Sequence, residues 1–176
     1  MIRRPPRSTL SSSSAASDVY KRQTLLYVVG ERGLREELEE AGLEMVGEEE
    51  AETATHVVVG IDRSFSYDKI AASLSALSRG AKLIATNPDP TYPTGRGLLP
   101  GAGAMVAAIS KCSGKRPLIV GKPSLRMYEF ALRILGMKPG EVVAVGDRVD
   151  LDIKPAKKLG MISVSYTHLR AHETRH

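Results

Sequence analysis

The sequence predicts an α/β fold in which parallel strands alternate with helices. Short runs of branched apolar residues recur along the chain, and each is followed by a segment whose apolar residues are spaced as on one face of a helix. Glycine follows most of these runs and ends most of the helical segments, as expected where a strand or a helix stops. Strands that alternate with helices in this way pair in parallel through right-handed crossovers.

The expected strands are short and apolar, and they occupy residues 25–29, 56–59, 82–85, 118–120, 142–145 and 162–164. The expected helices occupy about 34–41, 70–77, 103–110, 124–135 and 155–159. Ser124 is the expected N-cap of the fourth helix, whose inward face should carry Met127, Ala131, Ile134 and Leu135. Residues 86–100 are rich in Pro, Gly and Asn, so we expect a loop there.

The formal net charge of +5 comes from the two ends of the chain. Residues 1–23 and 165–176 together hold 7 of the 25 basic residues and 2 of the 20 acidic ones, which leaves 18 of each in residues 24–164. Nucleic-acid-binding domains usually carry a basic patch within the fold. The balanced interior therefore predicts no nucleic-acid partner. No apolar run approaches the length of about 18 residues that a membrane span needs, so no membrane partner is expected either.

Both ends lack the periodicity of a strand or a helix. They resemble translated sequencing-library adaptor, so we expect residues 1–23 and 165–176 to be disordered, non-native tails; native disordered tails are the alternative. Cys112 is the single cysteine, which excludes a disulfide framework within the chain. Because no apolar secretory segment follows the basic start, we expect a cytoplasmic protein. The sequence leaves homo-oligomerisation open.

Two polar segments follow expected strands in the second half of the chain, at residues 121–124 and 146–152. Ligands of open parallel sheets bind beyond the carboxyl ends of the strands. If the two strands are adjacent, with axes about 4.8 Å apart, Lys122 and Asp147 emerge side by side. Asp152 then lies in the first turn of a helix, where the helix dipole favours a carboxylate.

A lysine beside two carboxylates suits phosphoryl transfer. Mg²⁺ prefers one or two carboxylates together with waters and the phosphate of the substrate, and an ammonium group offsets charge on the phosphoryl oxygens. Two unit charges about 4 Å apart interact by about 4 kcal/mol at an effective dielectric of 20. A lone lysine after a strand is usually a surface residue and a lone aspartate there is often a cap, so the combination carries the prediction.

These segments resemble motifs of the haloacid dehalogenase superfamily phosphatases. The third and fourth family motifs match Gly121-Lys122-Pro123-Ser124 and Val145-Gly146-Asp147-Arg148-Val149-Asp150-Leu151-Asp152-Ile153. Two further segments, Ile84-Ala85-Thr86-Asn87-Pro88-Asp89 and Leu99-Pro100-Gly101-Ala102-Gly103-Ala104, resemble the subclass with a large α/β cap. That subclass includes p-nitrophenyl phosphatases, phosphoglycolate phosphatases and pyridoxal phosphate phosphatases. The resemblance covers residues 24–164.

The resemblance implies a partial doubly wound parallel core of the haloacid dehalogenase type with an α/β cap domain. Residues 24–100 would form the cap, and residues 101–164 the C-terminal half of the catalytic core. The activity implied is Mg²⁺-dependent hydrolysis of a phosphate monoester, with a small phosphorylated metabolite as substrate.

The resemblance also implies roles for five residues. Lys122 would steady an aspartyl-phosphate intermediate. Asp147 would act in catalysis by helping to hold Mg²⁺, and Asp152 would support the same metal site. Asn87 and Asp89 would lie in a cap loop that contacts the substrate, although an Asn-Pro-Asp-Pro sequence also forms a turn.

The chain departs from the family at one decisive point. The family's first motif, Asp-x-Asp-Gly, supplies the nucleophile and the general acid, and its second motif supplies a phosphate-binding Ser or Thr; neither is found in the sequence. The chain is therefore expected to be an N-terminally truncated fragment that is inactive alone.

Two other functions stay open at this point. A noncatalytic protein that binds a phosphorylated ligand follows from the missing nucleophile. A Rossmann-type nucleotide-binding module is suggested by Gly30-Glu31-Arg32-Gly33 after the first strand, although the spaced glycine triplet of that fold is lacking.

Overall fold

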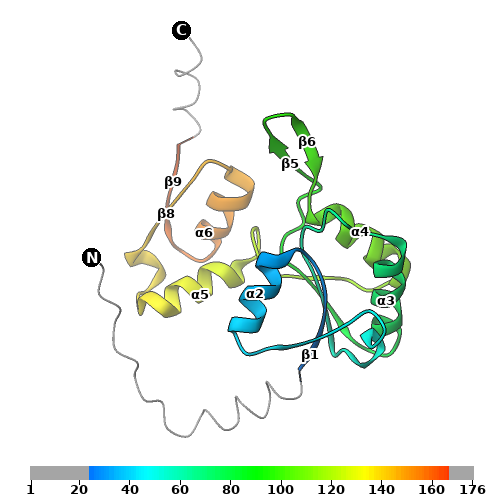
Figure 1. The fold of residues 1–176 in the computed structure, drawn as a ribbon. Helices are drawn as coiled ribbons and strands as arrows, with labels where there is room; N and C mark the ends of the chain where they lie inside the picture. The colour runs from blue at the N-terminus through cyan, green and yellow to red at the C-terminus, as the bar shows by residue number, and fades with distance from the viewer. Residues whose placement is uncertain (1–23, 167–176) are drawn as a thin grey trace, which may run out of the picture.

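Residues 24–166 are described by a computed structural model of the chain (Figure 1). In chain order its elements are β1 (Leu25–Val29), α2 (Arg32–Glu40), β2 (Glu44–Val46), η1 (Ala51–Thr53), β3 (His56–Val59), α3 (Tyr67–Ser78), β4 (Lys82–Ala85), β5 (Thr91–Thr94), β6 (Gly97–Pro100), α4 (Ala102–Ser113), β7 (Leu118–Ile119), α5 (Leu125–Leu135), η2 (Pro139–Glu141), β8 (Val143–Gly146), η3 (Val149–Ile153), α6 (Lys154–Lys158) and β9 (Ile162–Ser165). The α/β class and its parallel pairing are confirmed. None of the helices in this described part is long and apolar enough to cross a membrane.

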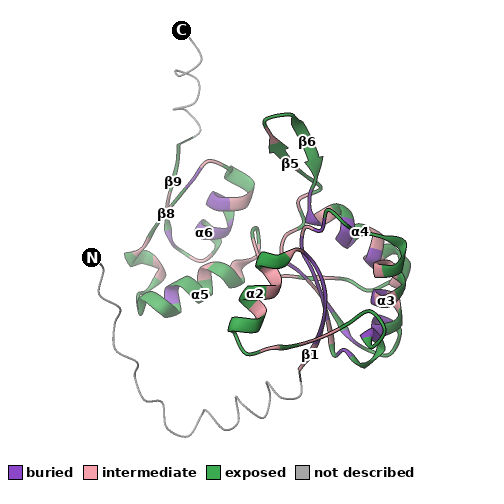
Figure 2. Ribbon diagram, in the orientation of Figure 1, coloured by how far each residue is buried: buried purple, intermediate pink, exposed green. Residues whose placement is uncertain are grey.

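A five-stranded sheet in the order β2-β1-β3-β4-β7 organises the first part of the chain, and all its pairs are parallel. Its strands are apolar on both faces because both faces are covered. Val29, Val57 and Val59 belong to a core cluster that also holds buried residues of α3 and α4. Val28 and Val58 point to the opposite face, where partly buried leucines of α2 pack. Figure 2 shows the centre of this sheet as buried, in agreement with the burial of β1 and β3.

A second packed unit follows and contains α5, β8, η3, α6 and β9. β8 and β9 form their own two-stranded parallel sheet, separate from the first. Its small core consists of Leu132, Ala156 and Met161, with Tyr128 packed against them. We call residues 25–119 the first unit and residues 125–166 the second unit.

The boundary expected at Pro100 must be corrected, because α4 and β7 pack with the first unit. Met105, Val106 and Ile109 of α4 lie in the same core cluster as the strands of the large sheet. β7 pairs with β4, with Leu118 opposite Ile84. The first unit therefore ends near Ile119. Its role as a cap stays a prediction.

The expected inward face of α5 is also wrong. Ser124 caps the helix as expected, since its side chain accepts a hydrogen bond from the Arg126 backbone N–H. The buried residue is however Leu132, whereas Ile134 is 69% exposed and Leu135 is 56% exposed. The helix turns Leu132 toward Ala156 of α6 and toward Met161, with which it forms the small core of this unit.

Two further features differ from expectation. Residues 91–100, within the expected loop, form the antiparallel hairpin β5–β6, and the short strand β2 was not expected. The C-terminal tail was expected to begin at residue 165, but Ser165 still belongs to β9, where it pairs with Gly146 of β8. Residues 1–23 and 167–176 lie outside the described residues, so the expectation for them stays a prediction.

A buried ion pair holds the loop between β3 and α3. Asp62 is only 2% exposed. Its carboxylate accepts hydrogen bonds from Lys69 Nζ at 2.7 Å and from both the backbone N–H and the hydroxyl of Ser64. Burial alone would raise the pKa of Asp62, but these donors lower it below its ordinary value. The carboxylate is therefore charged, and its charge is satisfied within the loop.

We expect Lys69→Ala to lower the free energy of unfolding by about 3 kcal/mol, because it leaves the Asp62 charge buried without its partner. Urea denaturation followed by circular dichroism measures the change. Lys157→Ala, at an exposed position of α6, is the matched control and should change stability by less than about 0.5 kcal/mol. Equal effects of the two substitutions would contradict a structural role for the Asp62–Lys69 pair.

Candidate active site

The polar segments identified in the sequence gather at the carboxyl edge of the large sheet. β4 and β7 continue to pair past their ends, since the Gly121 N–H donates to the Thr86 carbonyl oxygen at 2.8 Å. A side chain at Gly121 would overlap that oxygen, so only glycine allows the two backbones to approach so closely. Lys122 follows directly, joined to Pro123 by a cis peptide bond. Lys122 therefore leaves the sheet beside the start of the loop that joins β4 to β5 and carries Asn87 and Asp89.

The central contact is an ion pair between Lys122 and Asp152. Lys122 Nζ lies 2.7 Å from Asp152 Oδ1. The Asp152 side chain is 9% exposed and that of Lys122 is 48% exposed, so the ammonium group reaches a buried carboxylate from the surface. Because Lys122 follows the first unit and Asp152 belongs to the second, this ion pair links the two.

Asp152 is held from several sides. Its Oδ2 accepts the Arg148 backbone N–H at 3.1 Å, and its own N–H donates to the Arg148 carbonyl oxygen at 2.8 Å. The carboxylate lies against Gly146, where any side chain would overlap it. The Tyr128 hydroxyl donates to the Asp152 carbonyl oxygen at 3.2 Å. These contacts fix a π-helical turn, η3, a local geometry that occurs often at functional sites.

The electrostatics of the pair are mutual. The hydrogen bond to Asp152 raises the pKa of Lys122 above its ordinary value, and the charge of Asp147 acts in the same direction. Burial alone would raise the pKa of Asp152, but the hydrogen bonds from Lys122 and from the Arg148 N–H bring it below its ordinary value. Both groups are therefore charged at neutral pH.

Arg148 connects this turn to the Asn87–Asp89 loop. Its guanidinium lies 3.8 Å from Asp89 and 3.4 Å from Asp150. The loop itself is shaped by Asn87, whose side-chain oxygen accepts the Asp89 N–H at 3.1 Å. Asp89 is thus brought to the edge where Lys122 and Asp152 meet.

The glycines of the Pro-Gly-Ala-Gly segment position the same loop. Gly103 N–H donates to the Asp89 carbonyl oxygen at 2.8 Å, and Gly101 N–H donates to that of Pro90 at the same distance. A side chain at Gly101 or Gly103 would overlap the backbone of residues 88–89. The start of α4 can therefore press directly against the loop.

The predicted residues lie close together, but the strands that carry them are not paired as expected. β7 and β8 are not neighbours in one sheet, because β7 pairs with β4 and β8 pairs with β9. Lys122 meets Asp152 directly, while Asp147 follows β8 and acts on Lys122 through its charge. The expectation of adjacent strands was wrong, although the residues still gather at one site.

The chemistry of the site fits a Mg²⁺ ion only in part. Within residues 24–166, no group of three or more His, Cys, Asp or Glu side chains could hold a metal ion. Both oxygens of Asp152 already accept hydrogen bonds, from Lys122 and Arg148. Asp147 is the better candidate for a ligand, because a single carboxylate with waters and a substrate phosphate satisfies Mg²⁺. A metal role for Asp152 stays a prediction.

The turn after β1 is not built as a dinucleotide site. The Glu31 N–H donates to the Ile61 carbonyl oxygen at 3.1 Å, and the Glu31 carboxylate pairs with Arg63. A carboxylate at the start of a helix repels the phosphate that a Rossmann turn must receive. Gly30 lies against the end of the Leu34 side chain, and not against backbone. These contacts disfavour the nucleotide-binding alternative.

Sequence reasoning missed a pocket at the same edge of the first unit. Its volume is about 360 Å³, and it lies between the hairpin β5–β6 and the loop after β3. Asp62 and Arg63 contribute its polar side; its other lining residues are Phe65, Tyr92, Leu99, Pro100, Ala104 and Met105. The signal available in the sequence was Asp62 at the end of a strand, but the hairpin that closes the pocket was not expected.

Comparison with known proteins decides the family. A family model described as a haloacid dehalogenase-like hydrolase matches residues 7–160. The chain belongs to this family. The match begins within residues 1–23, which we expected to be non-native, and that expectation stays a prediction.

Similar proteins agree with this assignment. The chain is 42% identical over 141 residues to the 5'-nucleotidase YutF of Bacillus subtilis. This alignment covers 80% of this chain and 54% of that protein. It is 35% identical to an acid sugar phosphatase of Staphylococcus epidermidis, covering 90% of this chain and 61% of that one. The chain thus spans little more than half the length of these two curated relatives.

Solved structures show the same fold. A putative p-nitrophenyl phosphatase from Bacillus subtilis superimposes with a TM-score of 0.75 at 38% identity, covering 87% of this chain and 58% of that one. NagD from Escherichia coli K-12 superimposes with a TM-score of 0.73 at 34% identity, covering 92% of this chain and 65% of that one. The resemblance to the cap-bearing subclass is thereby confirmed.

We expect Asp152→Asn to lower the free energy of unfolding at pH 7 by about 1–3 kcal/mol, because it removes the charged acceptor of two hydrogen bonds. The folded-state pKa of Asp152 lies below its ordinary value of 3.8. The stability that the charged form contributes is therefore present above that value and is lost as the pH falls through the lowered pKa. Urea denaturation at pH 7 and at pH 3 should show a smaller difference between the variant and the parent at the lower pH.

Asp150→Asn is the matched control, because Asp150 lies in the same turn with a side chain that is 62% exposed. It should change stability by less than about 0.5 kcal/mol at both pH values. An Asp152→Asn effect that is no larger than this, or that does not shrink on acidification, would contradict the described role of the carboxylate.

Proposed function

We propose that the chain is part of a phosphatase that hydrolyses phosphate monoesters of small metabolites. The observation that carries the proposal is the Lys122 ammonium group, held by Asp152 at the edge of the sheet with the charge of Asp147 nearby. A fixed cation beside a carboxylate that can bind a metal is what a phosphoryl group needs during transfer. The names of similar proteins support the same class of substrate.

Each residue has a distinct proposed task. Lys122 contacts the phosphoryl oxygens and offsets their negative charge. Asp152 positions Lys122, because the 2.7 Å contact fixes the direction of a long and otherwise flexible side chain. Asp147 would be a ligand of Mg²⁺, which when bound neutralises charge on the phosphate group.

The complete reaction needs a nucleophile that this sequence lacks. In the proposed cycle, a carboxylate oxygen from an Asp-x-Asp-Gly motif attacks phosphorus, and the bond from phosphorus to the ester oxygen breaks as that oxygen takes a proton from a general acid. Water then hydrolyses the aspartyl phosphate. Lys122 can stabilise charge in both steps, but a lysine paired to Asp152 provides no nucleophile. We infer that this chain is inactive by itself.

The substrate would be selected by the first unit. The pocket beside the hairpin β5–β6 combines aromatic and aliphatic walls with Asp62 and Arg63, and its volume of about 360 Å³ suits the organic part of a small phosphate ester. Asn87 and Asp89 are proposed to contact the substrate from the loop that leads into this hairpin. Asp89 would do so after exchanging its contact with Arg148. A cytoplasmic location stays a prediction.

A noncatalytic protein that binds a phosphorylated ligand is the second candidate. The absence of an Asp-x-Asp-Gly motif from the sequence favours it. The two candidates differ in one respect: a longer chain that contains the motif should turn over substrate only if the phosphatase proposal is correct.

We expect this chain to show no turnover of p-nitrophenyl phosphate in the presence of Mg²⁺, and a longer chain with an upstream Asp-x-Asp-Gly motif to be active. The uncatalysed reaction is so slow that an acceleration of up to about 10²¹-fold is needed, which positioned charges without a nucleophile do not supply. In the longer chain, Lys122→Ala and Asp147→Asn should each lower kcat by about 10²-fold or more. Release of p-nitrophenol gives the rate.

Lys157→Ala in the longer chain is the matched control and should leave kcat unchanged. Turnover by the present chain, or full activity of the longer Asp147→Asn variant, would contradict the roles proposed for Lys122 and Asp147. An inactive longer chain that still binds inorganic phosphate would favour the noncatalytic candidate.

A further inference from the structure

A row of basic side chains lies at the amino edge of the large sheet, opposite the candidate active site. His56 begins β3 and Lys82 begins β4, and the two are paired in register. On the other side of β4, Ile84 pairs with Leu118. Lys82 lies two residues before Ile84, and Arg116 lies two residues before Leu118, so Arg116 continues the row. β3 and β4 therefore start with a basic residue at the same level, and Arg116, just before β7, lines the same hollow as both.

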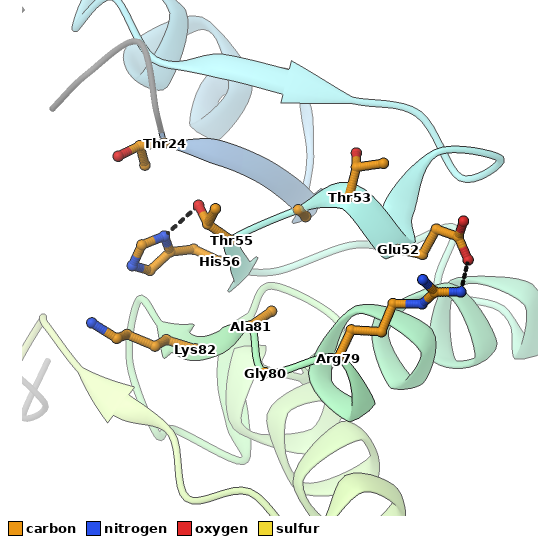
Figure 3. A pocket seen from close by; sticks show the side chains of 10 residues that line it. Thr24, Glu52, Thr53, Thr55, His56, Arg79, Gly80, Ala81 and Lys82 are labelled. Atoms are coloured by element: carbon orange, nitrogen blue, oxygen red, sulfur yellow. Dashed lines mark hydrogen bonds and ion pairs between the residues drawn. The ribbon is translucent and has the colours of Figure 1, made fainter. Parts of the chain in front are cut away.

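Two hollows open along this row. Their volumes are about 470 Å³ and 540 Å³, and both are lined by His56, Gly80, Ala81 and Lys82. The second hollow adds Lys115 and Arg116. In Figure 3 the side chains of His56 and Lys82 extend side by side from adjacent strands. The two hollows therefore adjoin one another along His56 and Lys82, and together they form the depression discussed below.

The acidic residue of this depression is already engaged. Glu52 pairs with Arg79 at 2.7 Å, and Figure 3 shows this pair at the end of the hollow away from His56 and Lys82. In the part of the chain that the structure describes, Lys82, Lys115 and Arg116 have no ion-pair partner. The positive charge of the row is therefore not neutralised by the described residues.

Like charges on directly opposite residues of neighbouring strands destabilise a sheet. Burial and the charge of Lys82 lower the pKa of His56 below its ordinary value of 6.5. One ring nitrogen of His56 contacts the Thr55 hydroxyl at 2.9 Å, which orients the ring and leaves the second nitrogen for a ligand. An anion placed between these groups would offset their repulsion and would favour protonation of His56.

We propose that this basic edge binds the phosphate group of a small metabolite, at a site separate from the candidate active site. His56, Lys82 and Arg116 would contact the phosphate oxygens, because lysine and arginine form strong charge-assisted hydrogen bonds with phosphate. The two hollows leave room for an organic group attached to the phosphate. The row spans only three strands, about 10 Å, which suits one phosphate group better than the repeating backbone of a nucleic acid.

The test titrates the chain with inorganic phosphate and, separately, with adenosine monophosphate at constant ionic strength. All samples carry Lys122→Ala, so that phosphate bound at the candidate active site contributes nothing. The imidazole resonances of His56 in the nuclear magnetic resonance spectrum report binding, and a His56→Gln sample assigns them. We expect a saturable shift, and we expect Lys82→Gln with Arg116→Gln to weaken the affinity by about tenfold or more.

Lys157→Gln is the control, since it removes one charge from an exposed position of α6, and it should leave the affinity unchanged. Tighter binding of adenosine monophosphate identifies a metabolite-borne phosphate, whereas equal binding identifies free phosphate. The proposal is overturned if His56 shows no saturable shift, or if the double variant binds as well as Lys157→Gln. It is also overturned if a short single-stranded oligonucleotide binds more than tenfold more tightly than either anion.

The pH dependence gives a second readout. The charged groups that line the same hollows as His56 are Lys82 from β4, Lys115 and Arg116 from the segment before β7, and, at the far end, the Glu52–Arg79 pair. A bound anion raises the pKa of His56. The contribution of protonated His56 to the affinity is therefore fully present below the pKa of His56 in the ligand-free protein. It is lost as the pH rises through the pKa of His56 in the complex. The phosphate group also titrates in this range, so the readout is the ratio of the parent's affinity to that of His56→Gln, in which the titration of the ligand cancels. This ratio should be higher at pH 6 than at pH 8, and a ratio that does not change with pH would contradict the role of His56.

Discussion

The contact between Lys122 and Asp152 is the interaction on which the candidate active site depends. A carboxylate as buried as Asp152 is costly unless a partner compensates its charge. Lys122 provides that compensation from the chain segment that follows the first unit, and the Arg148 N–H provides a second donor from the adjoining turn. The same contact that stabilises the carboxylate also fixes the lysine. Removing either residue would therefore affect both the packing of the second unit and the geometry of the site.

Close backbone contacts surround this ion pair. Gly121 permits the start of the lysine segment to lie against Thr86, and Gly146 permits Asp152 to lie against the end of β8. Gly103 does the same for the loop that carries Asp89. Each glycine is required by its surroundings rather than by its own dihedral angles, which explains why short glycine-containing motifs mark the site in the sequence. The polar residues occur at strand ends, and the glycines let those ends approach.

The sequence predicted the strands well, because local apolar runs and the glycines that follow them are sufficient to define short buried strands. It also pointed to Lys122, Asp147 and Asp152, which the structure places close together, since motifs at strand ends are local signals; their roles stay predictions. It did not predict that β7 joins β4, because strand pairing depends on contacts between distant parts of the chain. The hairpin β5–β6 was missed because Pro93 lies within β5, and proline in a sheet is confined to edges. The face of α5 was wrong because periodicity gives an apolar stripe without naming its partner.

The most direct test of this account is a double-mutant cycle on the ion pair. The free energy of unfolding would be measured by urea denaturation for the parent chain, Lys122→Ala, Asp152→Ala and the double variant at pH 7. If the two side chains stabilise each other as described, the effects should be non-additive, with a coupling energy of about 1 kcal/mol or more. Effects that add to within about 0.3 kcal/mol would show that Lys122 and Asp152 act independently, and would contradict the account.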